Sequence, residues 1–182
     1  MENRMKIIIV VVIVLIVLGL VIFMGRKTYV KPIDKYRYVR VWRKRNPDFD
    51  TRGGHWMNLA EIEVISGANN VALNKTVTAS SDYNVTQFPH GNFTNGKMDD
   101  FAHTRDGEEE WFLVDLGKEY KIDEIMLYNR LSCCQFRAED IVIQLSRNEN
   151  MSDMIESNLI TNEQAVKMKF TWVPSSKTIT AE

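Results

Sequence analysis

Alternating hydrophobic and polar residues mark most of the chain after residue 35. Leu59–Ile65 alternates strictly, as a β-strand with one buried face does. Similar short runs, rich in Val, Ile, Tyr, Trp and Thr, are separated by Asn, Gly, Asp and Ser, and no long helical period interrupts them. We therefore expect an all-β domain, a sandwich or barrel. The predicted extended segments are Tyr36–Lys44, Leu59–Ile65, Val71–Ser80, Trp111–Leu116, Ile122–Asn129, Ala138–Ser146 and Lys167–Val173.

The N-terminal part departs from this pattern with an unbroken apolar run, Ile7–Gly25. A helix rising about 1.5 Å per residue over this run can cross a hydrocarbon layer of about 30 Å. A cleaved signal peptide is the alternative, because Arg4 and Lys6 precede the run, but no small-residue cleavage site follows it. The predicted parts are a tail at 1–6, a transmembrane helix at 7–25, a juxtamembrane linker at 26–35 and the β-domain at 36–182.

Two signals disagree on the orientation of this anchor. Lys and Arg residues concentrate between Arg26 and Arg45, which favours a cytoplasmic β-domain by the positive-inside rule. Many of these charges, however, belong to the predicted strand that begins at Tyr36, and four glycosylation sequons favour the other side of the membrane. We favour an extracellular or lumenal β-domain and leave the cytoplasmic orientation open. The sequons begin at Asn74, Asn84, Asn92 and Asn150.

Charge and composition narrow the function classes. The net charge is −1, so no bulk electrostatic attraction points to nucleic acid as a partner. The three histidines show no metal-ligand spacing, and the chain has no nucleophile elbow. We therefore expect no enzyme activity. The four tryptophans are interpreted as core or strand-end packing rather than as a sugar platform: Trp42, Trp56, Trp111 and Trp172.

The stretch Asn129–Arg137, N-R-L-S-C-C-Q-F-R, contains the only two cysteines of the chain. Adjacent cysteines can close only a small, strained ring, with their Cα atoms about 3.8 Å apart. Such a ring would hold the two flanking arginines in fixed directions, and guanidinium groups suit ligand oxygens. The alternative is a pair of reduced, half-buried thiols beside solvated arginines.

Several motifs give the chain a resemblance to a known family. Trp111–Gly117 reads W-F-L-V-D-L-G and is followed by Ile122-Asp-Glu-Ile, which resembles a discoidin-type (coagulation factor type C) domain. Within that family, N-R-x-x-C-C-x-x-R marks the fucolectin branch, and Asn70–Ser81 and Asn92–Gly96 also match it. The resemblance implies a jelly-roll β-sandwich whose loops, at one end, bind sugars or lipid headgroups.

The resemblance also implies a sugar site. By position its members are His103, Arg130 and Arg137, which would hydrogen-bond the sugar, and a vicinal disulfide between Cys133 and Cys134 as an apolar patch. The alternative for His103 is a loop histidine that caps a turn.

One position departs from the fucolectin pattern. Two residues after the first arginine, where the branch carries an acidic residue, this chain has Ser132. A serine cannot balance two guanidinium charges, so the identity of the sugar is left open.

A structural Ca²⁺ site is a further implication of the resemblance. Calcium takes six to eight oxygen ligands, many of them backbone carbonyls. Asn95 stands where an aspartate is expected, and a plain Asn-Gly turn without metal is the alternative. The matching positions are the Ala60 and Lys97 carbonyls and the side chains of Glu61, Asn92, Asn95 and Asp100.

The order of the strands differs from that of the family. The segments that begin at Tyr38 and Leu59 look like the last two strands of such a domain, yet they come first. Because one copy of each strand is present, we favour a circular permutation over a truncated preceding domain.

Three functions follow from these features. The first is a membrane-anchored, lectin-like glycan-binding protein, possible as a homo-oligomer, since several copies would raise avidity. The second is a domain that binds anionic lipid. The third is a structural envelope or assembly sandwich without a ligand.

Overall fold

The computed structural model describes residues 35–44, 55–107, 109–157, 167–173 and 178–181. All of them belong to the unit Asp34–Glu182. The expected tail, transmembrane helix and nearly all of the linker lie outside the described residues. Among the residues that are described, no helix is long and apolar enough to span a bilayer.

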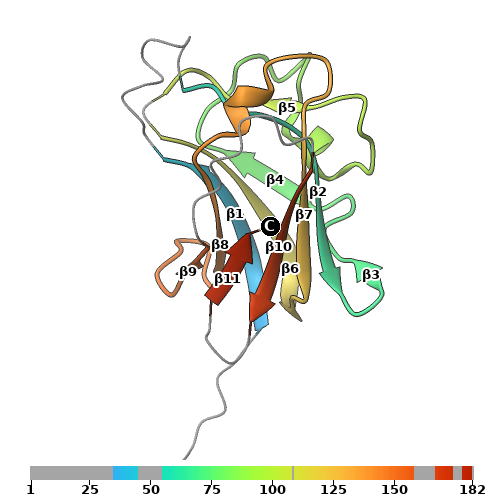
Figure 1. Cartoon of the computed structure of the whole chain (residues 1–182), viewed down its shortest axis with the longest axis vertical. Coiled ribbons are helices and arrows are strands. Elements are labelled where there is room, and N and C mark those ends of the chain that lie inside the picture. The colour runs from blue at the N-terminus through green and yellow to red at the C-terminus, as the bar shows by residue number, and fades with distance from the viewer. Residues whose placement is uncertain (1–34, 45–54, 108, 158–166, 174–177, 182) are drawn as a thin grey trace, which may run out of the picture. The chain divides into compact units, whose positions relative to one another are not determined.

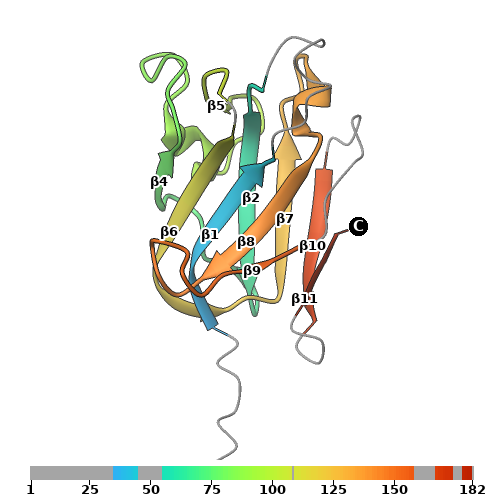
Figure 2. The ribbon, with the colours of Figure 1, turned by 90° about the vertical axis from the view of Figure 1, so that its left-hand side faces the viewer.

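Two antiparallel sheets lie face to face and form a β-sandwich (Figures 1 and 2). The described residues contain no α-helix, only the short 3-10 turns η2 (His90–Thr94) and η3 (Gln135–Ala138). In the described part, the first sheet has the order β4 (Thr76–Ala79), β6 (Glu110–Lys121), β1 (Lys35–Arg43), β8 (Ile141–Ser146), β9 (Ile155–Glu156). The second has the order β11 (Thr178–Ala181), β10 (Lys167–Val173), β7 (Glu124–Asn129), β2 (Asn58–Ser66), β3 (Asn69–Asn70), with β5 (Ala102–His103) paired to β2.

Alternation along the strands of the first sheet builds one side of the core. Val41 lies opposite Phe112 on β6 and Ile143 on β8, and all three side chains are fully buried. Two residues earlier on β1, Val39 is also buried and lies opposite Val114 of β6. Since successive side chains of a strand point to opposite faces, the intervening Arg40 faces outward. The strict hydrophobic period therefore fixes which face of the sheet is buried.

The second sheet supplies the opposite side of the core in the same way. Leu127 on β7 lies between Ile62 on β2 and Met168 on β10, and each side chain is at most 1% exposed. Such rows of apolar cross-strand neighbours remove both sheets from water where they face each other. The core is therefore a continuous layer between the sheets.

The first two strands of the chain occupy interior positions in the sandwich. β1 lies between β6 and β8, and β2 lies between β7 and β3. Both neighbours of β1 thus come much later in the sequence, whereas β2 lies between the later strand β7 and β3, which directly follows it in the chain.

Most predicted strands are present, but several bounds differ. β6 extends to Lys121, beyond the predicted end at Leu116, and β7 begins at Glu124 instead of Ile122. Residues 71–74 form a turn in which Asn74 has a positive φ of 56°, so β4 begins only at Thr76. β8 begins at Ile141 rather than at Ala138, because η3 takes up the residues before it. A further strand, β11, follows the predicted last strand and pairs with it.

A core truncation tests this packing. Phe112 is fully buried, and its ring lies 5.0 Å from that of Phe93. We expect Phe112→Ala to lower the free energy of unfolding by about 3–5 kcal/mol, because a cavity replaces the ring. The measurement is urea unfolding of the full chain in a mild detergent, followed by tryptophan fluorescence. Thr78→Ala on the exposed side of β4 is the control and should change that free energy by less than about 0.5 kcal/mol. Equal effects of the two variants would contradict the described core.

Candidate functional site

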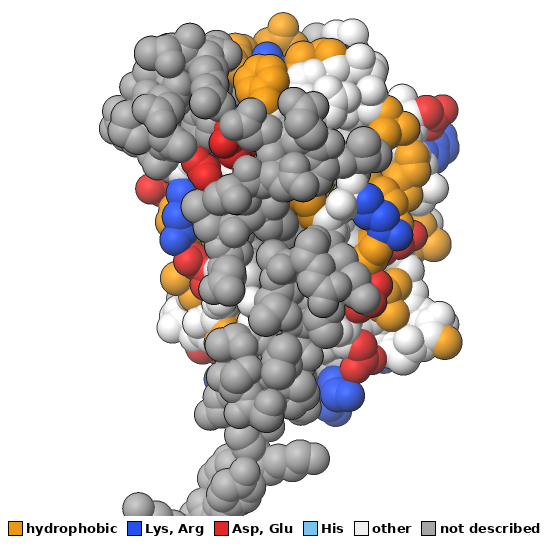
Figure 3. All heavy atoms as spheres, viewed as in Figure 1, with side chains coloured by type: hydrophobic (Ala, Val, Ile, Leu, Met, Phe, Trp, Pro, Cys, Tyr) orange, Lys and Arg blue, Asp and Glu red, His pale blue; other side chains and the backbone are white. Residues whose placement is uncertain are grey.

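β5 and η3 lie at the same end of the sandwich (Figure 1). A pocket of about 380 Å³ is lined by residues of both elements. Ligand pockets in proteins start at roughly 300 Å³, so this one has room for a small molecule. In Figure 3, hydrophobic side chains surround a basic one at the same end of the molecule. The residues that line the pocket are Trp56, Tyr83, Gln87, Phe88, His103, Arg130, Cys134 and Arg137.

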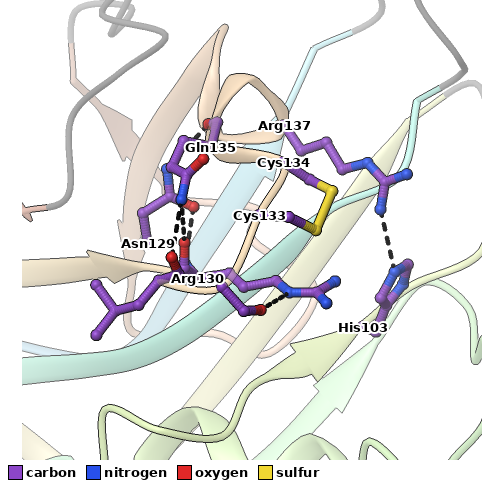
Figure 4. Close-up of a disulfide and its surroundings, with 9 residues drawn as sticks. His103, Asn129, Arg130, Cys133, Cys134, Gln135 and Arg137 are labelled. Carbon is purple, nitrogen blue, oxygen red and sulfur yellow. Dashed lines mark hydrogen bonds between the residues drawn. A yellow bond between two sulfur atoms is a disulfide. The ribbon is translucent and has the colours of Figure 1, made fainter.

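The loop Asn129–Arg137 forms one wall and is held by its own amide side chains (Figure 4). Nδ2 of Asn129 donates to the carbonyl of Gln135 over 2.9 Å. In return, Nε2 of Gln135 donates to the carbonyls of Arg130 and Leu131 over 3.2 and 3.1 Å. These bonds close the loop on itself and fix where the two arginines leave the backbone.

The two cysteines of this loop form a disulfide, with Cα atoms 3.8 Å apart. Cys134 has a positive φ of 66°, a conformation that side-chain-bearing residues rarely adopt. Its carbonyl accepts from the amide of Arg137 over 3.0 Å, which starts η3. The disulfide thus lies between the arginines and presents Cys134 to the pocket.

His103 comes from the opposite wall, on β5, where it pairs with Asn58 of β2. Its Nδ1 lies 2.6 Å from the Thr104 carbonyl, and its Nε2 lies 3.3 Å from Nη1 of Arg137. Because a carbonyl can only accept, Nδ1 carries the proton and Nε2 accepts from the arginine. His103 and Arg137, which the resemblance assigns to one site, therefore contact each other in the structure.

Burial and charge keep this histidine neutral. Burial lowers the pKa of His103, and the positive charges of Arg137 and Arg130 lower it further, against the opposing effect of the Thr104 bond. Burial also lowers the pKa of each arginine, and repulsion from Arg130 adds to the effect at Arg137. The guanidinium groups nevertheless remain charged, because arginine titrates far above neutral pH.

Aromatic rings form the remaining walls of the pocket, which no motif in the sequence predicts. The Tyr83 ring stacks on His103 with centroids 4.6 Å apart, and Trp56 meets the same imidazole edge-on at 5.6 Å. Phe88 completes this wall. Trp56, interpreted from the sequence as a packing residue, lies two residues before β2, packs edge-on against Tyr83 and His103, and also lines the pocket. The sequence feature that could have indicated these pocket residues is the presence of aromatic residues within otherwise polar loops.

Ser132 does contact an arginine, although it carries no charge. Nε of Arg130 donates to its hydroxyl over 2.7 Å. The same guanidinium lies over the Phe101 ring, with Cζ 4.0 Å from the centroid, a cation–π distance. Ser132 therefore orients the arginine as an acidic residue would, but without neutralising it.

The predicted calcium positions gather around the loop after η2. Gly96, with φ 80°, donates its amide to Oε2 of Glu61 over 3.0 Å and so ties this loop to β2. Nδ2 of Asn95 lies 3.2 and 2.9 Å from the two oxygens of Asp100 and 3.5 Å from Oδ1 of Asn92. The register shifts between Leu59 and Glu61, so Ala60 is the extra residue of a β-bulge.

Glu61 is the electrostatic anomaly of this region. It is fully buried, and its Oε1 has no hydrogen-bond partner among the described residues. Burial raises its pKa to about 8. In the described part of the chain, no three His, Cys, Asp or Glu side chains come together as metal ligands. A cation here would therefore rely on amide and carbonyl oxygens beside this carboxylate.

The four sequons differ in accessibility. Asn74, Asn84 and Asn150 are exposed. Asn92 is half-buried, and its Nδ2 donates to the Phe101 carbonyl over 3.1 Å. A glycan on Asn92 would therefore break a bond of the folded loop.

Comparison with known proteins adds one finding. A family model described as the NedA-like, galactose-binding domain, of the F5/F8 type C group, matches residues 92–178, a little under half of the chain. No curated protein and no solved structure matches the chain. The matched range contains His103, both pocket arginines and the disulfide, while Trp56 and Tyr83 lie before it. The matched domain is described as galactose-binding.

The disulfide makes a direct prediction about mass. Intact mass spectrometry of the unreduced full chain should give a mass about 2 Da below that of the reduced chain, because the bond removes two hydrogens. The result would also indicate an oxidising compartment. Equal masses before and after reduction would contradict the bond.

Proposed function

We propose that the domain is a carbohydrate-binding, lectin-like module whose site is the pocket between β5 and η3. The observation that carries this proposal is the convergence of His103, Arg130 and Arg137 beside the disulfide and the aromatic rings. A sugar needs fixed hydrogen-bonding groups for its hydroxyls and flat apolar surface for its C–H faces. This pocket offers both.

The arginines retain donors for such a ligand. Within the described residues, Arg130 uses only Nε and Arg137 only Nη1 in side-chain hydrogen bonds. Their other terminal nitrogens are left for ring and hydroxyl oxygens. The rings of Trp56 and Tyr83, together with the Cys134 sulfur, supply the apolar surface.

The proposal extends to the whole chain through its N-terminal run. A helix at residues 7–25 would anchor the module in a membrane, and display of several copies would compensate for weak binding at a single site. The exposed sequons and the disulfide favour an extracellular or lumenal position. The role is recognition or adhesion rather than catalysis.

Two finer assignments belong to the same proposal. The fucolectin branch of the family is supported by the C-C pair between Arg130 and Arg137. A jelly roll with a circular permutation is supported by the interior positions of β1 and β2, the first two strands of the chain.

A second candidate function, binding of anionic lipid, is favoured by one observation. Tyr83 and Val85 are each 50% exposed, and Leu131 is 53% exposed, on the two loops that carry the pocket. Exposed apolar side chains beside basic ones can enter a lipid surface.

We also propose that the loop after η2 holds a structural Ca²⁺ ion. The ligands would be the carboxylates of Glu61 and Asp100, the side-chain oxygens of Asn92 and Asn95, and the carbonyls of Ala60 and Lys97. The orphaned Oε1 of Glu61 supports this proposal, because a buried carboxylate keeps its charge only when it is paired or bound to a cation. The ion would stabilise the loop that lies next to β5.

Glycan binding can be tested on a glycan array and by calorimetry. The full chain, kept in a detergent without a sugar headgroup, should bind glycans. Arg130→Ala and Arg137→Ala should each lower the affinity by about tenfold or more, since each removes charge-assisted hydrogen bonds. Arg147→Ala is a matched control, because Arg147 is exposed and pairs with Asp153 on the loop after β8. Absence of glycan binding, or binding that Arg130→Ala and Arg137→Ala leave unchanged, would contradict the proposal. Arginine-dependent flotation with anionic vesicles and no glycan binding would favour the lipid function.

The calcium proposal predicts a metal-dependent melting temperature. At a hundredfold excess of Ca²⁺ over the dissociation constant, binding should add about 2.7 kcal/mol to the free energy of unfolding. The melting temperature of the full chain should therefore rise in Ca²⁺ relative to EDTA. Glu61→Gln should abolish the rise, whereas Glu63→Gln, which changes the same charge on the same strand, should keep it. A rise that survives in Glu61→Gln, or no rise at all, would overturn the site.

A further inference from the structure

The pocket carries positive charge that its own walls do not balance. Two of its lining residues are arginines, and no carboxylate lines it among the described residues. His103 is neutral, because Nδ1 bonds to the Thr104 carbonyl and Nε2 accepts from Arg137. The unliganded site therefore holds two formal positive charges in a partly buried space.

The acidic group that acts on Arg137 is already engaged elsewhere. Asp106 raises the pKa of Arg137, but its Oδ1 accepts from the amide of His55 and lies 3.9 Å from Nδ1 of the same residue. It is absent from the pocket lining. No acidic group acts on Arg130 in the described part, where burial alone lowers its pKa.

Ser132 leaves this imbalance in place. Its hydroxyl holds Nε of Arg130 over 2.7 Å and directs the guanidinium, yet contributes no negative charge. The terminal nitrogens of Arg130 are thus oriented but electrostatically unsatisfied. An aspartate or glutamate at this position would have satisfied them internally.

The surroundings of the guanidinium groups make an anionic partner favourable. Arg130 lies on the Phe101 ring at 4.0 Å, and Arg137 lies 5.6 Å from the Trp56 centroid. Each ring excludes water from one side of a guanidinium group but does not neutralise its charge. A desolvated charge is unfavourable unless it is paired. The planar fork of arginine matches the two oxygens of a carboxylate or sulfate.

We propose that the pocket selects acidic saccharides, sugars that carry a carboxylate or sulfate group, over their neutral counterparts. This selectivity rests on the proposed glycan-binding function and specifies its ligand class. The anion lies between Arg130 and Arg137, while the sugar ring contacts the aromatic wall and the disulfide.

Matched ligands test the selectivity. Isothermal titration of the full chain, in a detergent without a sugar headgroup, compares methyl α-galactopyranoside with the corresponding methyl galacturonide and with galactose 6-sulfate. At least one acidic sugar should bind about tenfold or more tightly than the neutral one. The difference should shrink between about 0.05 M and about 0.5 M salt, because salt screens charge–charge attraction. Inorganic sulfate and acetate, added alone, should bind more weakly than the acidic sugars.

A charge substitution tests whether the unbalanced charge of Arg130 causes the selectivity for acidic sugars. Ser132→Asp should move the ratio of acidic to neutral affinities toward the neutral sugar by about tenfold, since the new carboxylate neutralises Arg130 internally. Ser152→Asp adds the same charge on the exposed loop after β8, away from the pocket residues, and should leave the ratio unchanged. Melting temperatures of both variants show whether each is folded.

The outcomes separate the two proposals. A neutral sugar that binds as tightly as both acidic sugars, or a ratio that Ser132→Asp does not move, overturns the selectivity and leaves glycan binding intact. Inorganic sulfate that binds as tightly as galactose 6-sulfate also overturns it, because the sugar then contributes nothing. Absence of binding to all three sugars overturns the selectivity, and absence of binding to every glycan of the array overturns both proposals. So does arginine-dependent binding to phosphatidylserine vesicles without any sugar binding.

Discussion

The hydrogen bond from Nη1 of Arg137 to Nε2 of His103 joins the two walls of the pocket. It exists only while His103 is neutral with its proton on Nδ1. Burial favours the neutral form, and the Thr104 carbonyl fixes the proton on Nδ1. On the other wall, the disulfide and the side-chain hydrogen bonds of Asn129 and Gln135 fix the start of η3. The arginine that reaches across is therefore held at both ends.

The sandwich makes this junction possible by placing distant segments at one end. β5 pairs with β2, near the start of the domain, and β7 pairs with β2 from the other side. His103 is the last residue of β5 and Arg130 directly follows β7, so the sheet register sets their separation. Burial of residues such as Leu127 and Ile62 keeps the register from slipping, because a shift of one residue would turn apolar side chains outward.

Sequence patterns predict the scaffold well and the walls of the site poorly. The strand Lys167–Val173 is found with the predicted bounds, because alternation is a direct record of which face is buried. The grouping of His103, Arg130 and Arg137 in one pocket is predicted by the family resemblance and not by any hydrophobic period. Trp56 and Tyr83 escape prediction because they lie in loops, where no period links position to burial. For the same reason, the contact between Ser132 and Arg130 could not be derived from residue type alone.

Glycan recognition by this pocket is tested most directly by nuclear magnetic resonance on the ¹⁵N-labelled full chain. The side-chain nitrogen signals of His103, Arg130 and Arg137 are followed while galactose-type sugars, neutral and acidic, are added. We expect these three residues to shift together and to saturate, while Arg147 on the loop after β8 stays unchanged. Unshifted signals at all three, with or without changes elsewhere, would contradict a sugar site between β5 and η3.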